Sequence, residues 1–173
     1  ITWPAFCSAH WRSWRTTSAN CKTMSAFAIG NLSVLLAIPG LGAVLLALAP
    51  RRNAPALFAV ALLASGIDFL WSVKILMGFD AGSGEMQFLE RIPWIPAFGI
   101  EYIVGVDGIS LFLVLLTTLL TPIAILASWS VKDRVKEYLV FMLLLETGML
   151  GAFVALDLFL FYVFWEVMLV PMY

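Results

Sequence analysis

Three acidic residues lie inside long apolar stretches of this sequence. Glu166 stands in DLFLFYVFWEVMLVPMY, Glu146 in VFMLLLETGMLGAF, and Asp68 in an earlier apolar stretch. A charge at the centre of a bilayer costs roughly 2.5–3.5 kcal/mol on insertion scales, and desolvation favours the protonated form of a carboxyl group. A carboxyl group that gains and loses a proton in a dry interior is suited to proton relay. Glu166 is therefore the first candidate for a relay, Glu146 a second candidate proton site, and Asp68 a weak candidate.

The two glutamates also have structural interpretations. Glu166 could pair with a lysine or a backbone carbonyl on a neighbouring helix. Glu146 could be a hydrogen-bonded packing residue, because Gly148 and Gly151 follow it and permit close helix contact. Pro171 favours the relay at Glu166, since it removes the N–H that would bond the carbonyl four residues earlier and leaves that carbonyl free for water. Membrane helices, however, contain more prolines than soluble ones in any case.

Other charged residues have simpler explanations. Asp107 stands before ISLFL and Asp157 before LFLF, where an acid caps the free N–H groups of a helix start and meets its positive end. Asp68 and Lys74 are six residues apart, which separates them by about 120° on a helix, so they are poor partners. Lys74 is near the end of its apolar stretch and can extend to the interface.

The composition is that of an integral membrane protein. The chain is 62% hydrophobic and 12% charged, with a mean hydropathy of +0.99, whereas soluble domains carry about a quarter charged residues. The sequence contains no basic stripe of the kind that would indicate nucleic-acid binding. Cys7, His10 and Cys21 form no motif of clustered metal ligands, and there is no phosphate-binding or dinucleotide-binding glycine motif.

The hydropathy pattern predicts an all-α polytopic membrane protein with about five transmembrane helices. About 20 helical residues span a bilayer core, and five stretches qualify or nearly do: about 26–49, 54–77, 109–129, 138–156 and 157–173. The last would reach only about 24 Å. We therefore expect a fragment cut inside a helix, with residues 24–173 as the membrane domain.

The stretch before the first helix differs from the rest. Residues 1–23 contain three tryptophans, three basic residues and no helical or strand period. Met24 immediately precedes the first apolar helix. We interpret residues 1–23 as a non-native or upstream tail and Met24 as the natural start, with a genuine extramembrane tail as the alternative.

The loops indicate an orientation. Basic residues cluster after the first and third helices, which places these two loops on the cytoplasmic side: Arg51, Arg52, Lys132, Arg134 and Lys136. The long loop between the second and third helices is then outside. Its Trp94–Pro96 and Ile100–Val104 segments could form a small hairpin on the membrane surface, with Pro93 and Pro96 restricting such strands to an edge.

Two long segments resemble a known family. IPAFGIEYIVGVDGISLFLVLLTTLLTPIAILASW and LETGMLGAFVALDLFLFYVFWEVMLVPMY are similar to helices two to five of the antiporter-like, proton-pumping subunits of complex I, the NADH:quinone oxidoreductase. The ordered set is WIP-x-FGI, VDGIS and FWE-x-x-LVPM. The same motifs also resemble the D-type subunit of multisubunit Na⁺/H⁺ antiporters and membrane subunits of related hydrogenases.

The resemblance implies a function. In this family the glutamate of the WE motif, which falls on Glu166, transfers protons, and its lysine partners lie in later helices. The chain would be a membrane-arm subunit that moves protons while quinone is reduced elsewhere, with a sodium or hydrogenase-related role as the alternative. NADH, flavin, iron–sulfur clusters and quinone would belong to partner subunits. The implied location is a bacterial inner membrane in preference to the mitochondrial one, with the other membrane-arm subunits and lipid as partners.

Overall fold

The computed structural model describes residues 30–50, 54–80, 86–95, 100–130 and 134–172. The interpretations that concern residues 1–23, Met24, Arg51, Arg52 and Lys132 lie outside this part of the chain. Its elements, in chain order, are α2 (Asn31–Leu48), α3 (Ala54–Met77), β1 (Gln87–Ile95), β2 (Ile100–Val106), α4 (Gly108–Ala127), the 3-10 turn η2 (Ser128–Ser130), α5 (Val135–Val154) and α6 (Leu158–Met172).

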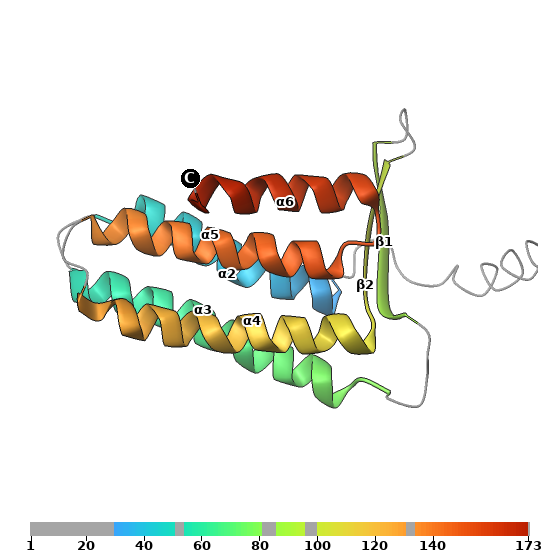
Figure 1. Ribbon diagram of the computed structural model, residues 1–173, viewed down its shortest axis with the longest axis horizontal. Helices are drawn as coiled ribbons and strands as arrows, with labels where there is room; N and C mark the ends of the chain where they lie inside the picture. Colours follow the sequence, from blue (N-terminus) through green and yellow to red (C-terminus); the bar gives the residue numbers. More distant parts are fainter. Residues whose placement is uncertain (1–29, 51–53, 81–85, 96–99, 131–133, 173) are drawn as a thin grey trace, which may run out of the picture.

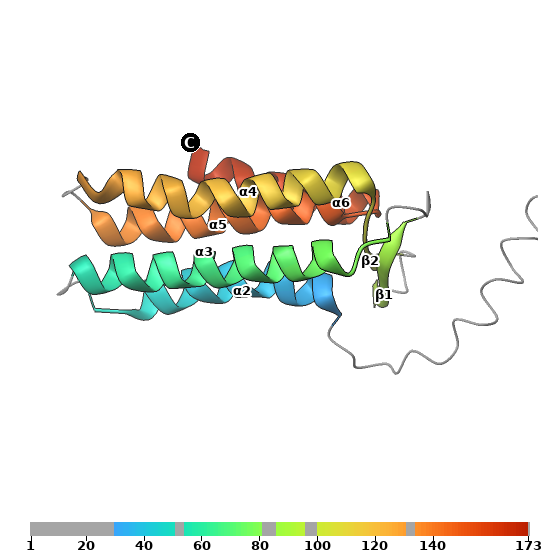
Figure 2. The ribbon, with the colours of Figure 1, turned by 90° about the horizontal axis from the view of Figure 1, so that it is seen from below.

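The predicted membrane architecture is confirmed. Four helices of the described chain are long and apolar enough to cross a bilayer, namely 31–48, 55–77, 108–130 and 135–154, and α6 is a shorter apolar helix. The four long helices run side by side along the molecule, with α2 and α3 in one layer and α4 and α5 in the other (Figure 1, Figure 2). Helix α6 packs on α5 and touches β2, outside the four-helix bundle.

Both boundaries of the fourth membrane helix differ from the prediction by two or three residues. The fourth membrane helix begins at Val135 instead of 138, after Arg134 adopts a left-handed conformation at φ 48°. It ends at Val154 instead of 156, because the next two residues join the hairpin. Ala155 forms a bridge with Val104, and the Leu156 N–H donates to the carbonyl of Ile103 at 2.9 Å.

The predicted hairpin exists and is longer than expected. Strands β1 and β2 pair antiparallel, with Glu90 opposite Val104 and Pro93 opposite Glu101. The first strand begins at Gln87, well before the predicted start at Trp94. Pro93 is tolerated because β1 is an edge strand of this two-stranded sheet. The hairpin lies across the end of the bundle where α2 and α4 begin (Figure 1).

A carboxylate of the hairpin is bound to the start of α2. The Leu32 N–H donates to Glu90 Oε1 at 2.8 Å, and the Ser33 hydroxyl donates to the same carboxylate. The Tyr102 hydroxyl lies 3.2 Å from Ser33 Oγ, and burial raises the pKa of Tyr102. A bulge next to Phe88, at φ 54°, precedes Glu90 in β1. Glu90 therefore supplies hydrogen-bond acceptors for N–H groups in the first turn of α2, which have no partner within the helix.

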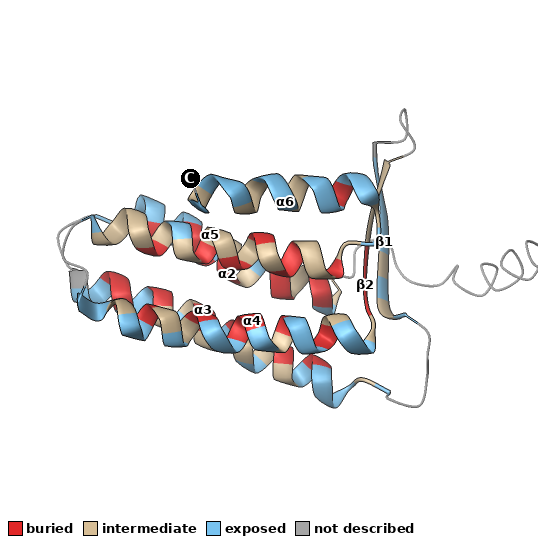
Figure 3. Ribbon diagram, in the orientation of Figure 1, coloured by how far each residue is buried: buried red, intermediate tan, exposed pale blue. Residues whose placement is uncertain are grey.

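Two apolar clusters fill the ends of the bundle. The hairpin-end cluster consists of Leu32, Leu35, Leu36, Ile75, Val104, Val106, Leu111, Val114, Leu150, Val154 and Leu160. The loop-end cluster consists of Ala43, Leu46, Leu57, Phe58, Ala61, Ile125, Leu139 and Leu143. Figure 3 shows the buried residues on the facing sides of the helices, with exposed residues facing outward. The middle of the bundle lies between these clusters.

Candidate functional site: a buried polar layer

The middle of the bundle is polar. All buried polar or charged side chains of the described chain lie on α3, α4 and α5, and we call them the polar layer: Ser65, Asp68, Ser72, Thr117, Thr118, Thr121 and Glu146. The layer separates the hairpin-end cluster from the loop-end cluster. Four membrane helices thus enclose a polar interior at mid-length, where each polar group must find a partner or remain unsatisfied.

Helix α3 presents one polar face to this layer. Ser65, Asp68 and Ser72 are spaced by three and four residues, which aligns them on one side of a helix. All three have no exposed surface. Ser65 and Ser72 donate to the carbonyls of Leu62 and Phe69, one turn back along the helix, so their hydroxyls are satisfied locally.

Helix α4 contributes three threonines. Thr118 Oγ1 lies 2.9 Å from Ser72 Oγ, which joins α4 to α3 inside the bundle. Thr121 donates to the carbonyl of Thr117 at 3.0 Å. Pro122 has no N–H, so the carbonyl of Thr118 loses its usual helical donor. The layer therefore contains a hydroxyl pair and a backbone acceptor without its helical partner.

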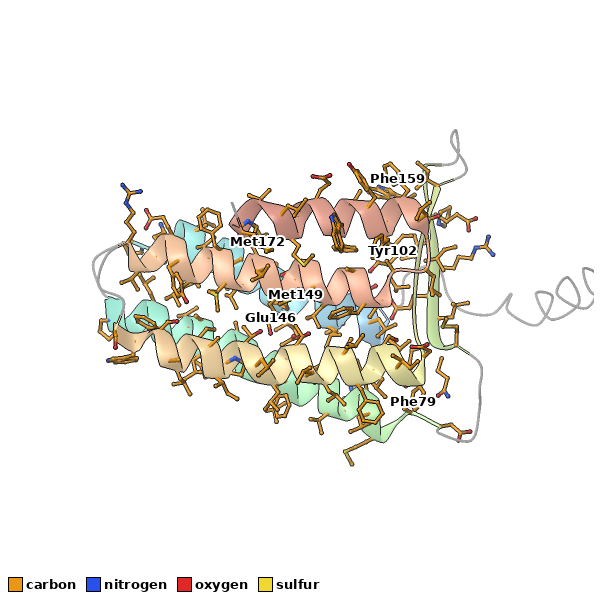
Figure 4. The ribbon with its side chains drawn as sticks, viewed as in Figure 1. Phe79, Tyr102, Glu146, Met149, Phe159 and Met172 are labelled. Carbon is orange, nitrogen blue, oxygen red and sulfur yellow. The ribbon has the colours of Figure 1, made fainter. Side chains whose placement is uncertain are left out.

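The acids of the layer have no hydrogen-bond partner. Both carboxylate oxygens of Asp68 and both of Glu146 are buried and unbonded within the described chain. The two side chains are close enough for their charges to repel. Thr121 lies beside Glu146, but its proton is directed to Thr117. Glu146 points from α5 into the space facing α4 (Figure 4). Two unpaired carboxylates in such a place are costly.

Glu166 lies elsewhere. It is the ninth residue of α6, and its side chain is exposed on the surface of the described chain. Its neighbour is the Tyr162 hydroxyl, one turn earlier. Helix α6 contacts α5 and β2 but makes no comparable contact with α3 or α4. The structure therefore brings Asp68 and Glu146 together and leaves Glu166 apart.

The glycines after Glu146 face α6, not the polar layer. A Cβ at Gly148 would lie 3.2 Å from the backbone of Met168, and one at Gly151 would collide with the ring of Phe164. These two positions allow α6 to approach α5 closely. Pro171 is inside the last turn of α6, and its effect on water near Glu166 stays a prediction.

The remaining acids occupy helix starts. Asp107 Oδ1 accepts from the Ser110 N–H at 2.7 Å, and the Ser110 hydroxyl accepts from the Asp107 N–H, which completes a capping box. The Ser110 N–H holds the pKa of Asp107 below its usual value. Asp157 accepts from the Phe159 N–H at 2.8 Å at the start of α6. Both acids act as helix caps.

Lys74 does not approach Asp68. Its ammonium nitrogen lies 3.9 Å from the ring centroid of Trp71, and the side chain is exposed near the end of α3. This cation–π contact keeps the charge near the hairpin end of the bundle. The described residues contain no group of three or more His, Cys, Asp or Glu side chains that could hold a metal ion.

The sequence interpretation missed the hydroxyl residues and the cap on α2. The spacing of Ser65, Asp68 and Ser72 was a usable signal for a polar helix face, as was the threonine spacing in α4. Glu90 gave no local signal, because the N–H groups that it accepts from are 58 residues away in sequence.

Known proteins match this chain in sequence and in fold. The family model of the amino terminus of NADH-ubiquinone oxidoreductase chain 4 matches residues 54–154. NADH-quinone oxidoreductase subunit M of Rhodobacter capsulatus is 46% identical over 146 residues, which cover 82% of this chain and 28% of the relative. Chain 4 of Arabidopsis thaliana is 42% identical over 144 residues, covering 83% and 29%. The chain spans less than a third of the length of these relatives.

Solved structures match the fold of this chain. A chain of respiratory complex I from Thermus thermophilus with bound NADH superposes with a TM-score of 0.67 at 28% identity, covering 81% of this chain and 27% of that one. An archaeal membrane-bound sulfane sulfur reductase gives a TM-score of 0.68 at 23% identity, covering 82% and 22%, and shows a shared fold. With more than half of its residues matched by the family model, this chain belongs to the NADH-ubiquinone oxidoreductase chain 4 family.

Proposed function

We propose that this chain is part of a membrane-arm subunit of a proton-translocating NADH:quinone oxidoreductase. Family membership supports the assignment to such a complex. The observation that carries proton transfer is the pair of buried, unpartnered carboxyl groups, Asp68 and Glu146, inside four membrane helices. A carboxyl group enclosed in this way gains most from binding a proton, and a small change in its surroundings alters its proton affinity.

The three acids have different positions and therefore different roles in this proposal. Glu146 and Asp68 hold protons in the closed interior of the bundle. Glu166 is exposed on α6, where a basic side chain from another segment or subunit can reach it and stabilise its anion. Protons pass through these groups while oxidation of NADH and reduction of quinone take place in partner subunits, which hold the flavin and iron–sulfur clusters.

Membership of the same family supports the proposed location and partners. Relatives occur in bacteria and in plants. We propose the bacterial inner membrane for this chain. Its partners are the other membrane-arm subunits and the lipid bilayer. The competing function is that of a D-type subunit of a multisubunit Na⁺/H⁺ antiporter or of a membrane subunit of a related hydrogenase, which the motifs also resemble.

Replacement of Glu166 by Gln in the full-length subunit tests the function. Gln keeps the size and hydrogen bonding of Glu but cannot titrate. We expect an assembled complex with normal NADH oxidation by artificial acceptors, at least a tenfold loss of proton pumping and a matching loss of coupled quinone reduction, on the order of a 1.4 kcal/mol barrier change or more. Glu166→Asp keeps the acid and should retain part of the activity.

The control is Glu101→Gln on the hairpin, where the carboxylate pairs with Arg91 outside the membrane helices; it should pump normally. Normal pumping by Glu166→Gln would show that this residue is structural. Failure of Glu166→Gln and Glu166→Asp to assemble would favour a packing role. Sodium–proton exchange by the complex without NADH would support the antiporter instead.

A further inference from the structure

We propose that Asp68 and Glu146 form a single occluded proton-binding site that carries at most one negative charge. The two acids come from different helices, α3 and α5, and meet only in the folded bundle. Its part in translocation rests on the function proposed above. The proton-binding site itself rests on the enclosure and charge balance of the bundle, which are independent of that function.

The helices around the pair offer no positive charge to balance two carboxylates. Helices α2 and α4 contain no titratable residue between Asn31 and Leu48 or between Gly108 and Ala127. On α3 the charged neighbour is Lys74, six residues away and held over Trp71, about 9 Å along the axis. Two carboxylates without a cation in an apolar interior are strongly unfavourable, so at least one of them binds a proton.

The other titratable groups lie at the ends or on the outside of the bundle. Helix α5 carries Lys136, Glu137 and Tyr138 in its first turn, about 12–15 Å along the axis from Glu146. Helix α6, which packs on the opposite side of α5, carries Tyr162 and Glu166, both exposed.

Further titratable groups lie at the hairpin end of the bundle: Glu90, Arg91, Glu101 and Tyr102 on the hairpin, and the helix caps Asp107 and Asp157. They lie beyond the hairpin-end cluster, at the end of the bundle (Figure 1). Within the described chain, then, the charged group nearest to Asp68 is Glu146, and no cation lies beside the pair.

Enclosure limits what can neutralise the pair. Asp68 and Glu146 have no exposed surface, and the two apolar clusters close the bundle on either side of the layer. A lysine from another segment could not reach them unless the helices separated. A proton needs a much smaller opening, because a single water molecule or a rotating hydroxyl group can carry it. The enclosed pair therefore differs from Glu166, which a basic side chain can approach directly.

The hydroxyls of the layer extend the site toward the hairpin. Ser72 follows Asp68 by one helical turn on the same face, and its hydroxyl pairs with that of Thr118 at 2.9 Å. Both hydroxyls also lie within hydrogen-bond distance of carbonyls of their own helices, those of Phe69 and Val114, so proton exchange with the pair requires these side chains to rotate. Beyond them the hairpin-end cluster is apolar, and proton exit in that direction requires this cluster to admit water or move.

The test uses wild-type complex in native membranes and a hydrophobic carbodiimide, which modifies protonated carboxyl groups in apolar surroundings. We expect Asp68 or Glu146 to be modified at neutral pH, as mapped by peptide mass spectrometry, together with an infrared band from a protonated buried carboxyl. Absence of both signals would overturn the proposal. Protection of the pair by sodium ions at constant pH would also overturn it, because the site would then hold sodium.

The variants Asp68→Asn and Glu146→Gln test whether the pair is one site. An amide in place of one acid removes the repulsion and donates a hydrogen bond to the other, which favours the anion of the remaining acid. Modification of that acid should therefore be lost at a pH about one unit lower than in the wild type, a tenfold change in its proton affinity. The double variant should pump no worse than either single variant. If the two acids were independent sites, the loss of pumping in the double variant would be the product of the losses in the two single variants. Gly66→Ala, on α3 but outside the layer and with nothing within 4 Å of the added methyl group, is the control and should leave the pH dependence of modification unchanged.

The outcomes separate this site from the proposed function. Modification of the pair with normal pumping by both variants would keep the proton-binding site and reject its part in translocation. Loss of pumping with no protonated carboxyl in the wild type would keep the function and reject the site. If the variants fail to assemble, the wild-type carbodiimide and infrared measurements still decide whether the pair binds a proton.

Discussion

The closed interior of the bundle and the outer face of α6 both carry acids in apolar surroundings, but the two regions differ in how far they bury these acids. Asp68 and Glu146 are fully enclosed and have no hydrogen-bond partner among the described residues, whereas Glu166 is exposed. An enclosed carboxyl must bind a proton or share one, because nothing else can reach it. An exposed carboxyl on a helix face can recruit a cation. The surroundings of an acid, more than its residue type, decide the chemistry that it can perform.

Helix α5 belongs to both regions. Its inward face carries Glu146, and its other face carries Gly148 and Gly151, on which α6 rests. A disturbance of one face of α5 should therefore affect the interior acids and the α6 acid to different extents. This makes α5 the place where the two regions can be separated by mutation.

The largest effect is expected from Gly151→Ala. The added methyl group collides with the Phe164 ring, whereas the same change at Gly66 meets nothing within 4 Å. Gly151→Ala should destabilise the contact between α5 and α6 by about 1–3 kcal/mol. Gly66→Ala should be neutral or stabilising by up to about 1 kcal/mol. Thermal unfolding of the full-length subunit in its complex measures both.

The same two variants test whether the bundle interior and α6 are independent regions. Carbodiimide modification of Asp68 and Glu146 should stay the same in Gly151→Ala, because α6 contributes no residue to the polar layer. If the interior acids become more reactive when α6 is displaced, the two regions are not independent.

A smaller effect is expected at the helix caps. Asp107→Ala removes a cap of α4, a bundle helix, and Asp157→Ala removes a cap of α6. Each change should cost about 1 kcal/mol. Hydrogen exchange should accelerate at the Ser110 amide in the first variant and at the Phe159 amide in the second. Equal acceleration at both amides in either variant would show that α6 is not separable from the bundle.

The smallest effect is a pH dependence at Asp107. Hydrogen bonds to its carboxylate hold its pKa in the folded state below the usual value, so the cap is fully effective above about pH 4. As the pH falls through the lowered folded-state value, the carboxylate gains a proton and the cap weakens. Exchange at the Ser110 amide should therefore lose protection in acid. Asp107→Asn should show no such loss, since an amide oxygen caps at any pH; a parallel loss would point to another group.

Local structure was readable from the sequence because its causes lie within a few residues. Apolar runs of membrane-spanning length predicted the helices, and α3 has the predicted bounds, Ala54–Met77. Asp107 and Asp157 were recognisable as caps from the apolar residues that follow them. The end of α5 was wrong by two residues, because Ala155 and Leu156 pair with β2, which lies about 50 residues earlier.

The sequence by itself determined which stretches are helical, which acids lie in apolar runs and which glycines permit close packing, since hydropathy, capping and the absence of a side chain are local properties. Only the tertiary structure decided that Asp68 meets Glu146, that Ser72 meets Thr118 and that Glu166 stays exposed. These relations depend on which helix faces pack together. That choice is made by the combined burial of two apolar clusters drawn from five helices and strand β2, and no single stretch of sequence contains it.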